Sequence, residues 1–245
     1  MSMALMMSTV GRVLGQLRHD RRSVGLLIGA PLLLLTLIYF MFEENGRVLD
    51  RVLLIMLGIF PFLLMFLVTS IAMLRERASG TLERLFTTPL GKLDLLFAYG
   101  IAFGLAATVQ ATVATTVAYW LFDLDTTGSG ALVVLIAVGN ALLGVGLGLL
   151  CSAFARTEFQ AVQFLPIVVL PQILLSGLFV PRTQMAGWLE GVSEAMPLAH
   201  GVDALQEIAV NADATAELWR GYGIVMGCVV LALVLAAATL RRRTA

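Results

Sequence analysis

The sequence predicts an all-α integral membrane protein with six transmembrane helices. Hydrophobic residues make up 59% of the chain and charged residues only 13%, against roughly 45–50% and 25% in soluble domains. The mean hydropathy is correspondingly high, at +0.93. Six apolar runs are each near or above the ~20 residues that cross a bilayer as a helix, and most charged residues lie between these runs. These observations place residues 1–245 in a single membrane domain.

The first residues predict an amphipathic helix at the membrane surface. Val10, Leu14 and Leu17 follow the i, i+4, i+7 spacing of one helical face, while Arg12 lies on another face. A helix with one apolar and one basic face lies in the membrane interface rather than across the bilayer. We therefore expect residues 1–22 to form an interface helix before the first span.

The six apolar runs define the predicted spans. None of them carries Asp, Glu, Lys, Arg or His near its middle. The spans are residues 24–42, 52–74, 95–122, 131–154, 159–180 and 218–240. Because the number of spans is even, both termini are expected on the same side of the membrane.

The distribution of Lys and Arg predicts which side that is. Twelve of the 16 Lys and Arg residues fall in the segments on the side of the termini, and four fall on the opposite side. Cytoplasmic segments of membrane proteins carry an excess of these residues. We therefore predict a multi-pass protein with both termini in the cytoplasm. The segments that carry the excess are 1–23, 75–94, 155–158 and 241–245.

Residues 75–92 form the charged connection between the second and third spans. Gly80 favours a break after the preceding span, and Pro89 disfavours helical conformation in the residue before it, which leaves room for about two helical turns. Three apolar side chains share one face of this short helix, since they fall at i, i+3 and i+4: Leu82, Leu85 and Phe86. The pattern predicts a short amphipathic helix along the cytoplasmic membrane surface.

The run from Glu76 to Leu90 reads Glu-Arg-x-x-Gly-Thr-Leu-Glu-x-Leu-x-x-Thr-Pro-Leu. It resembles the signature of type-2 ABC permeases, the membrane subunits of prokaryotic ABC exporters for drugs, lipids and polysaccharides. In that family this segment is a coupling helix that seats in a groove of a separate ATPase subunit. The resemblance implies ATPase-coupling roles for Glu76, Gly80, Thr81, Leu82, Glu83, Leu85, Phe86 and Pro89.

The fifth predicted span contains two prolines. Pro166 and Pro171 lie within it, with Gln163 and Gln172 beside them. Proline removes a backbone donor, so carbonyl groups are left free unless a neighbour or water satisfies them. We predict that this span is kinked or broken. The four residues are candidates for lining a translocation path, and a proline kink without functional role is the alternative.

The segment 181–217 is the longest connection and is expected on the outer side. Five residues trace one helical face that we expect to dip into the outer interface: Met185, Trp188, Leu189, Val192 and Met196. The stretches from Leu174 to Pro181 and from Met196 to Leu198 resemble a second block of the same permease family. The resemblance implies short re-entrant helices after the fifth span.

Two glycine pairs have the spacing that lets helices approach closely, Gly100/Gly104 in the third span and Gly144/Gly148 in the fourth. We expect them to pack within the subunit. A place in a dimer interface stays open as the alternative.

The sequence also limits the classes of function. Ion-coupled transporters need titratable groups at depth in the membrane, and the predicted spans have none near their middles. The chain has no Gly-x-x-x-x-Gly-Lys-Ser/Thr phosphate loop. Cys151 and Cys228 have neither metal-ligand nor disulfide spacing. We therefore predict a chain that is not an enzyme, has no catalytic, cofactor-binding or metal-binding residue, and binds no nucleic acid.

Taken with the resemblance, these features predict a permease subunit that dimerises with a second copy or a related permease in the bilayer. Two ATPase subunits would bind ATP and Mg²⁺ and drive an amphipathic or hydrophobic, drug-like or lipid-like substrate outward across a prokaryotic inner or plasma membrane.

Two other classes are weighed against this prediction. A secondary, ion-coupled transporter is disfavoured by the lack of intramembrane charge. An intramembrane enzyme acting on lipid or peptide would need buried Ser and His, paired Asp or a His-Glu-x-x-His cluster, and the sequence has none of these. His200 and Gln206 depart from the family's second block, which leaves the substrate open.

Overall fold

The computed structural model describes residues 3–79 and 91–239, and within these ranges the regular elements are helices. In chain order they are α1 (Met3–His19), α2 (Arg21–Phe42), α3 (Gly46–Ala78), α5 (Lys92–Leu121), α6 (Gly130–Ser152), α7 (Glu158–Phe164), the π-helical turn η1 (Leu165–Val169), α8 (Leu170–Leu174), the 3-10 turn η2 (Arg182–Gln184), α9 (Gly187–Glu194), α10 (Pro197–Val210) and α11 (Ala216–Thr239). The prediction of an all-α fold is confirmed for this part of the chain.

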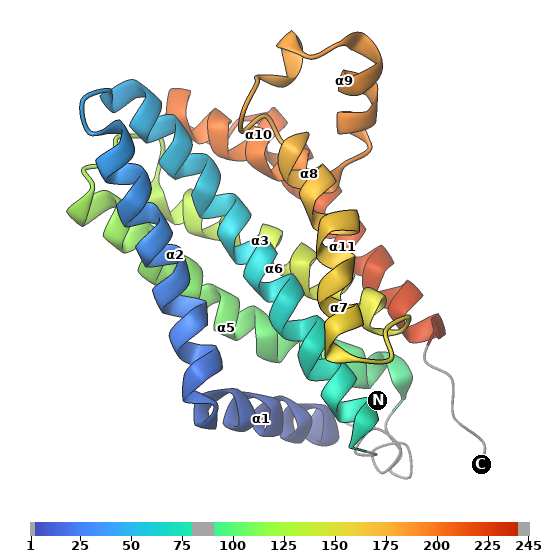
Figure 1. Ribbon diagram of the computed structural model, residues 1–245. Coiled ribbons are helices and arrows are strands. Elements are labelled where there is room, and N and C mark those ends of the chain that lie inside the picture. The colour runs from blue at the N-terminus through green and yellow to red at the C-terminus, as the bar shows by residue number, and fades with distance from the viewer. Residues whose placement is uncertain (1–2, 80–90, 240–245) are drawn as a thin grey trace.

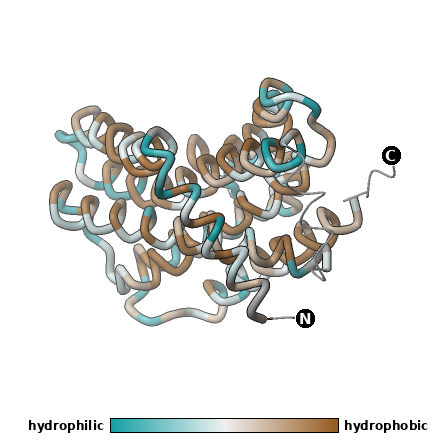
Figure 2. The backbone as a smooth tube through the Cα atoms, turned by 90° about the horizontal axis from the view of Figure 1, so that it is seen from below, coloured by the Kyte–Doolittle hydropathy of each residue, from teal (hydrophilic) through white to brown (hydrophobic). Residues whose placement is uncertain are grey.

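Five of the described helices, α2, α3, α5, α6 and α11, are long and apolar enough to cross a membrane. Helix α3 is the longest, with 33 residues, or about 50 Å at the α-helical rise. It therefore extends beyond the predicted run 52–74 at both ends. Figure 2 shows hydrophobic residues along most of the helical turns, with hydrophilic residues gathered largely in the connections.

The fifth predicted span differs from the expectation. Its helical part, Glu158–Leu174, is shorter than the other five, whereas the predicted run was 159–180. The chain turns after Leu174, and Gly177 adopts a left-handed conformation with φ of 91°, which glycine tolerates because it has no Cβ. Helix therefore ends before the apolar run does.

The long helices alternate in direction, so the chain crosses repeatedly between two ends of the bundle (Figure 1). Helix α1 lies across one end, at a steep angle to α2. The short helices α8, α9 and α10 gather at the other end. We call these the α1 end and the α10 end.

Helix α6 is the centre of the bundle, since it packs against α3, α5, α10 and α11. Helix α3 is enclosed by its neighbours, because 72% of its most apolar stretch is buried in the protein. The buried share of the corresponding stretch of α2 is only 17%. Helix α2 therefore lies at the edge, where its apolar side chains are left to face lipid.

The glycine pair in α6 explains its closeness to α3. A Cβ atom on Gly144 would lie 2.1 Å from the carbonyl oxygen of Phe62, and one on Gly148 would lie 2.5 Å from that of Phe66. Real Cβ atoms do not approach so closely, so α3 occupies the space that side chains at these positions would need. The expected packing within the subunit is confirmed for this pair.

Helix α1 packs onto the start of α5 through its apolar face. Met6, Val10 and Val13 are buried in the same core as the long helices. At least part of the apolar face of α1 is therefore covered by protein.

Asp20 lies between α1 and α2 and caps α2, because its carboxylate accepts a hydrogen bond from the backbone N–H of Ser23 at 3.2 Å.

Candidate functional site

Three consecutive charged residues end α3 at the α1 end, and each contacts a different helix. Arg75 Nε donates to Glu158 Oε1 of α7 at 2.8 Å. Arg77 Nη1 donates to the carbonyl oxygen of Ser152, the last residue of α6, at 3.0 Å. Successive residues of an α-helix are about 100° apart around the axis, so three neighbours point in three directions. The end of α3 is thereby fastened to several helices at once.

Glu76, the middle residue of the three, points into the chain. Its Oε1 accepts a hydrogen bond from Arg12 Nη1 of α1 at 2.7 Å, and the residue is only 7% exposed. Arg12 Nη2 also donates to the hydroxyl of Tyr99 on α5 at 3.1 Å, and Tyr99 is 1% exposed. The sequence resemblance placed Glu76 among the ATPase-coupling residues, whereas the structure pairs its carboxylate with α1.

Sequence reasoning did not identify Arg12 or Tyr99 as partners of Glu76. The two contacts join positions 64 and 87 residues apart along the chain. Nothing in the local pattern around Arg12 distinguishes it from the other arginines of the first segment. Only the docking of α1 beside α5 and the end of α3 brings the three side chains together.

The other predicted coupling residues lie outside the described residues. They are Gly80, Thr81, Leu82, Glu83, Leu85, Phe86 and Pro89. The helices that bracket them, α3 and α5, are described up to Ser79 and from Gly91.

The two prolines of the predicted fifth span lie where the helix changes its winding. Pro166 is the second residue of η1, and Pro171 is the second residue of α8. The N–H of Leu170 bonds to the carbonyl oxygen of Leu165, five residues earlier, which is the spacing of a π-helix. The predicted interruption is therefore present as a π-helical turn between two α-helical pieces.

The two glutamines of this stretch have different surroundings. Gln163 is exposed on α7, whereas Gln172 on α8 is buried. Gln172 Oε1 accepts a hydrogen bond from the backbone N–H of Leu198 at 3.3 Å, in the first turn of α10. Because the first N–H groups of a helix have no partner within the helix, Gln172 caps α10. It holds the α10 end together and does not line an open surface.

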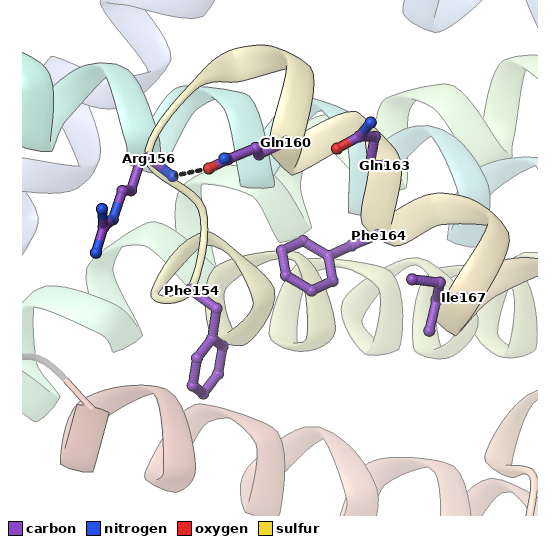
Figure 3. Close-up of a pocket in the computed structure, with 6 residues that line it drawn as sticks. All are labelled: Phe154, Arg156, Gln160, Gln163, Phe164 and Ile167. Carbon is purple, nitrogen blue, oxygen red and sulfur yellow. Dashed lines mark hydrogen bonds between the residues drawn. The ribbon is translucent and has the colours of Figure 1, made fainter.

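A groove of about 340 Å³ lies beside α7 (Figure 3). It is lined by Phe154, Arg156, Gln160, Gln163, Phe164 and Ile167. Figure 3 shows Phe164 and Ile167 projecting toward the same side as the ring of Phe154. The groove therefore combines an apolar wall with the polar residues Arg156, Gln160 and Gln163, which suits an amphipathic molecule.

A second, larger groove of about 660 Å³ lies at the α10 end. Its lining is mostly apolar: Pro171, Leu174, Leu175, Phe179, Val180, Gln184, Met185 and Leu189. Three of the four path candidates thus fall on exposed or groove-lining positions, namely Gln163, Pro166 and Pro171.

Arg182 holds the short helices of the α10 end in place. Its guanidinium donates to Ser193 Oγ of α9 at 2.7 Å and forms an ion pair with Asp203 of α10. Burial raises the pKa of the Asp203 carboxyl, and the neighbouring Arg182 opposes that shift. Arg51 of α3 donates to the carbonyl oxygen of Gly177 at 3.0 Å. The segment after α8 is therefore tied back to the bundle.

Asn140 is a fully buried polar side chain of α6, and its carboxamide forms no hydrogen bond with a described residue. A Cβ atom on Gly201 of α10 would lie 2.0 Å from Asn140 Oδ1, and one on Gly58 of α3 would lie 2.9 Å from its Nδ2. Two glycines thus make room for this amide where α3, α6 and α10 meet.

The sequence was compared with known protein families and curated proteins. A family described as ABC-2 type transporter matches residues 3–210. The chain is 29% identical over 154 residues to the probable multidrug ABC transporter permease YbhR of Escherichia coli. The matched region covers 63% of this chain and 42% of that protein.

Two further relatives have a lower percentage identity to this chain. Linearmycin resistance permease protein LnrN of Bacillus subtilis is 23% identical over 62% of this chain and 40% of its own length. ABC transporter G family member 20 of Dictyostelium discoideum is 25% identical over 72% of this chain and 24% of its own length. The matched region therefore spans less than half the length of each of these relatives.

Proposed function

We propose, because this chain belongs to the ABC-2 type transporter family, that it is the membrane permease subunit of an ABC exporter. Two permease chains, either two copies or one copy with a related permease, pair with two ATPase subunits. The ATPases bind ATP and Mg²⁺, and this chain supplies the route for the substrate. The observation that carries the proposal is the family match over residues 3–210, which extends from α1 through α10.

In this proposal the ATPase acts on the connection between α3 and α5. Residues Leu82, Leu85 and Phe86 form an apolar ridge for its groove, and Glu83 offers a negative charge beside the ridge. The contacts of Arg75 and Arg77 support this role, because α7 and α6 are both fastened to the end of α3. A push on that end is passed to other helices.

We further propose that α7, η1 and α8 form the one remaining crossing, the fifth in chain order, and line the route of the substrate. The exposed Gln163 and Pro166 and the grooves at both ends of this stretch support the assignment. An apolar lining with few polar groups suits an amphipathic or hydrophobic cargo, either drug-like or lipid-like. Relatives named for multidrug transport and linearmycin resistance support a cargo of this kind.

The orientation follows from the basic residues. We place the α1 end in the cytoplasm of a prokaryotic cell and the α10 end outside the inner or plasma membrane. Single cysteines at Asn45, Ser129 and Ala212 should react with an impermeant maleimide in intact cells, and ones at Ser8 and Ser79 should not. Labelling of Ser79 from outside would invert the topology and remove the proposed contact with an ATPase.

The decisive experiment is co-purification with a candidate ABC ATPase subunit from the same organism. Leu85→Asp and Phe86→Asp would bury a carboxylate in an apolar contact, which costs several kcal/mol, so both should detach the ATPase. Glu83→Gln keeps the shape and removes one charge, so the complex should survive while permease-stimulated ATP hydrolysis falls. Normal binding and hydrolysis in both ridge variants would contradict the proposal.

A further inference from the structure

Arg12 bridges the two helices that bracket residues 80–90. Its Nη1 donates to Glu76 on the last turns of α3 at 2.7 Å, and its Nη2 donates to the Tyr99 hydroxyl on α5 at 3.1 Å. Glu76 lies two residues before the end of α3, and Tyr99 is the eighth residue of α5. One side chain from α1 thus contacts both helices close to the point where the connection leaves them.

The chemistry of this contact is specific to arginine. A guanidinium is a planar group with donors in a fixed fork, so two of its nitrogens can hold two acceptors at a set separation. Glu76 and Tyr99 are almost fully buried, and the Arg12 side chain is 29% exposed. An ion pair that is partly shielded from water is stronger than one on the surface. In this arrangement the fork therefore fixes the separation of the two acceptors, and salt screens the pair less than it screens a fully exposed one.

The neighbouring charges do not compete for the same partners. Arg75 pairs with Glu158, and Arg77 donates to the carbonyl of Ser152. Both contacts join α3 to other helices, and neither reaches α5. The Arg12 guanidinium is hydrogen-bonded to both helices, and the Glu76 carboxylate also interacts with Tyr99 across the same junction.

The bridge also has unused hydrogen-bonding positions. Arg12 Nε and Glu76 Oε2 are buried, and neither has a hydrogen-bond partner among the described residues. Buried polar groups without partners cost free energy. The bridge therefore leaves two buried polar atoms that this arrangement of the described helices does not satisfy.

We propose that Arg12 is a positioning residue for energy coupling: it sets the spacing between the end of α3 and the start of α5 and moves α1 with them. The inference rests on the proposed function, since coupling requires an ATPase that acts on the connection between these helices. It assigns Glu76 to a contact inside the chain, in place of the contact with the ATPase that the resemblance implied.

The spacing can be measured directly with spin labels. Cysteines introduced at Ser79 and Gly91 report the distance between the two helix ends by pulsed electron paramagnetic resonance, after Cys151 and Cys228 are replaced by Ala. The chain is reconstituted in lipid nanodiscs, first alone and then with its ATPase in the nucleotide-free and vanadate-trapped states. We expect one narrow distance peak for the wild-type chain and a single shifted peak on trapping.

Arg12→Gln should replace the narrow peak by a broad distribution and abolish the permease-dependent stimulation of ATP hydrolysis. Tyr99→Phe keeps the ion pair and loses one hydrogen bond, so it should broaden the peak less. Arg12→Lys keeps the positive charge but loses the fork, so the ATPase should still bind while stimulation falls. Arg75→Gln is the matched control, since it removes an arginine from α3 that does not contact α5, and its peak should stay narrow.

A narrow peak in Arg12→Gln overturns the inference, as does equal broadening in Arg12→Gln and Arg75→Gln. If Arg12→Gln is not recovered folded, Arg12→Lys and Tyr99→Phe decide by the same criterion. A failure of the proposed function is seen separately, because the wild-type chain would then not bind the ATPase at all. The peak widths of the chain alone would still report whether Arg12 sets the spacing.

Discussion

The contact between α3 and α6 and the stretch from α7 to α8 are both apolar, yet they are built in opposite ways. In the first, Gly144 and Gly148 bring two backbones so close that no methyl group fits between them. In the second, Phe159 and Ile167 are exposed, and the winding changes to a π-helix at the prolines. Interiors packed to high density resist deformation, whereas a stretch with few neighbours can move. The comparison separates a rigid frame from an adaptable segment beside it.

The largest loss of stability is expected from substitutions in the rigid frame, the contact between α3 and α6. Gly144→Ala and Gly148→Ala force α3 and α6 apart, so each should cost about 1–3 kcal/mol or more. Gly223→Ala and Gly227→Ala are matched controls, since this pair on α11 has the same spacing but nothing within 4 Å of an added Cβ. The controls should be neutral or stabilising by up to about 1 kcal/mol. Thermal unfolding in detergent measures both, and equal losses in the two pairs would contradict the division.

The second prediction concerns the adaptable segment. Replacing Pro166 and Pro171 together by Ala should restore regular α-helical hydrogen bonding and remove the π-helical turn, because proline in a helix costs about 3 kcal/mol. Insertion and folding should be retained while ATP-driven dye transport in inside-out vesicles drops several-fold. Pro31→Ala in α2 is the control for a proline inside a peripheral helix. Unchanged transport in the double variant would reduce both prolines to a kink without function.

The third prediction separates the two glutamines within that segment. Gln172→Leu leaves the N–H of Leu198 without its acceptor, which should cost about 1–3 kcal/mol. Gln163→Leu should leave the unfolding temperature unchanged, because its side chain is exposed, but should alter transport. A larger loss of stability in Gln163→Leu than in Gln172→Leu would show that the two positions have been assigned the wrong way round.

The smallest loss of stability is expected from the ion pair between Arg75 and Glu158, which joins α3 to α7 at the α1 end. The side chains of Arg75 and Glu158 are 61% and 52% exposed, and surface ion pairs contribute at most about 1 kcal/mol. Arg75→Gln should therefore lower the unfolding free energy slightly, and less so in high salt, because salt screens exposed charges. A loss of several kcal/mol would mean that α7 is held as firmly as α6.

The family signature and the positions of five long helices could be predicted from the sequence. Both depend on local properties, since a run of about 20 apolar residues must form a helix in lipid to satisfy its own backbone. The fifth run was apolar over 159–180, but its helix ends at Leu174. Hydropathy could not predict that end, because the turn at Gly177 depends on backbone conformation and on the bond from Arg51.

Contacts of individual side chains, unlike the helices, could not be predicted from the sequence. Gln163 and Gln172 are both glutamines near a proline of the same apolar run, so the sequence does not distinguish them. Only the position of α10 decides that Gln172 is a buried cap. Glu76 belongs to a signature that implied contact with another subunit, yet its carboxylate faces Arg12.

The helical class, the apolar spans, the basic asymmetry and the family can be recognised in the sequence alone, because each depends on residues that are neighbours in the chain. Three features depend on the tertiary structure: which glycines allow α3 and α6 to approach, where α1 docks and which charges are paired. Those outcomes depend on contacts between residues far apart in the chain, such as Arg12, Glu76 and Tyr99, and no local periodicity encodes such contacts.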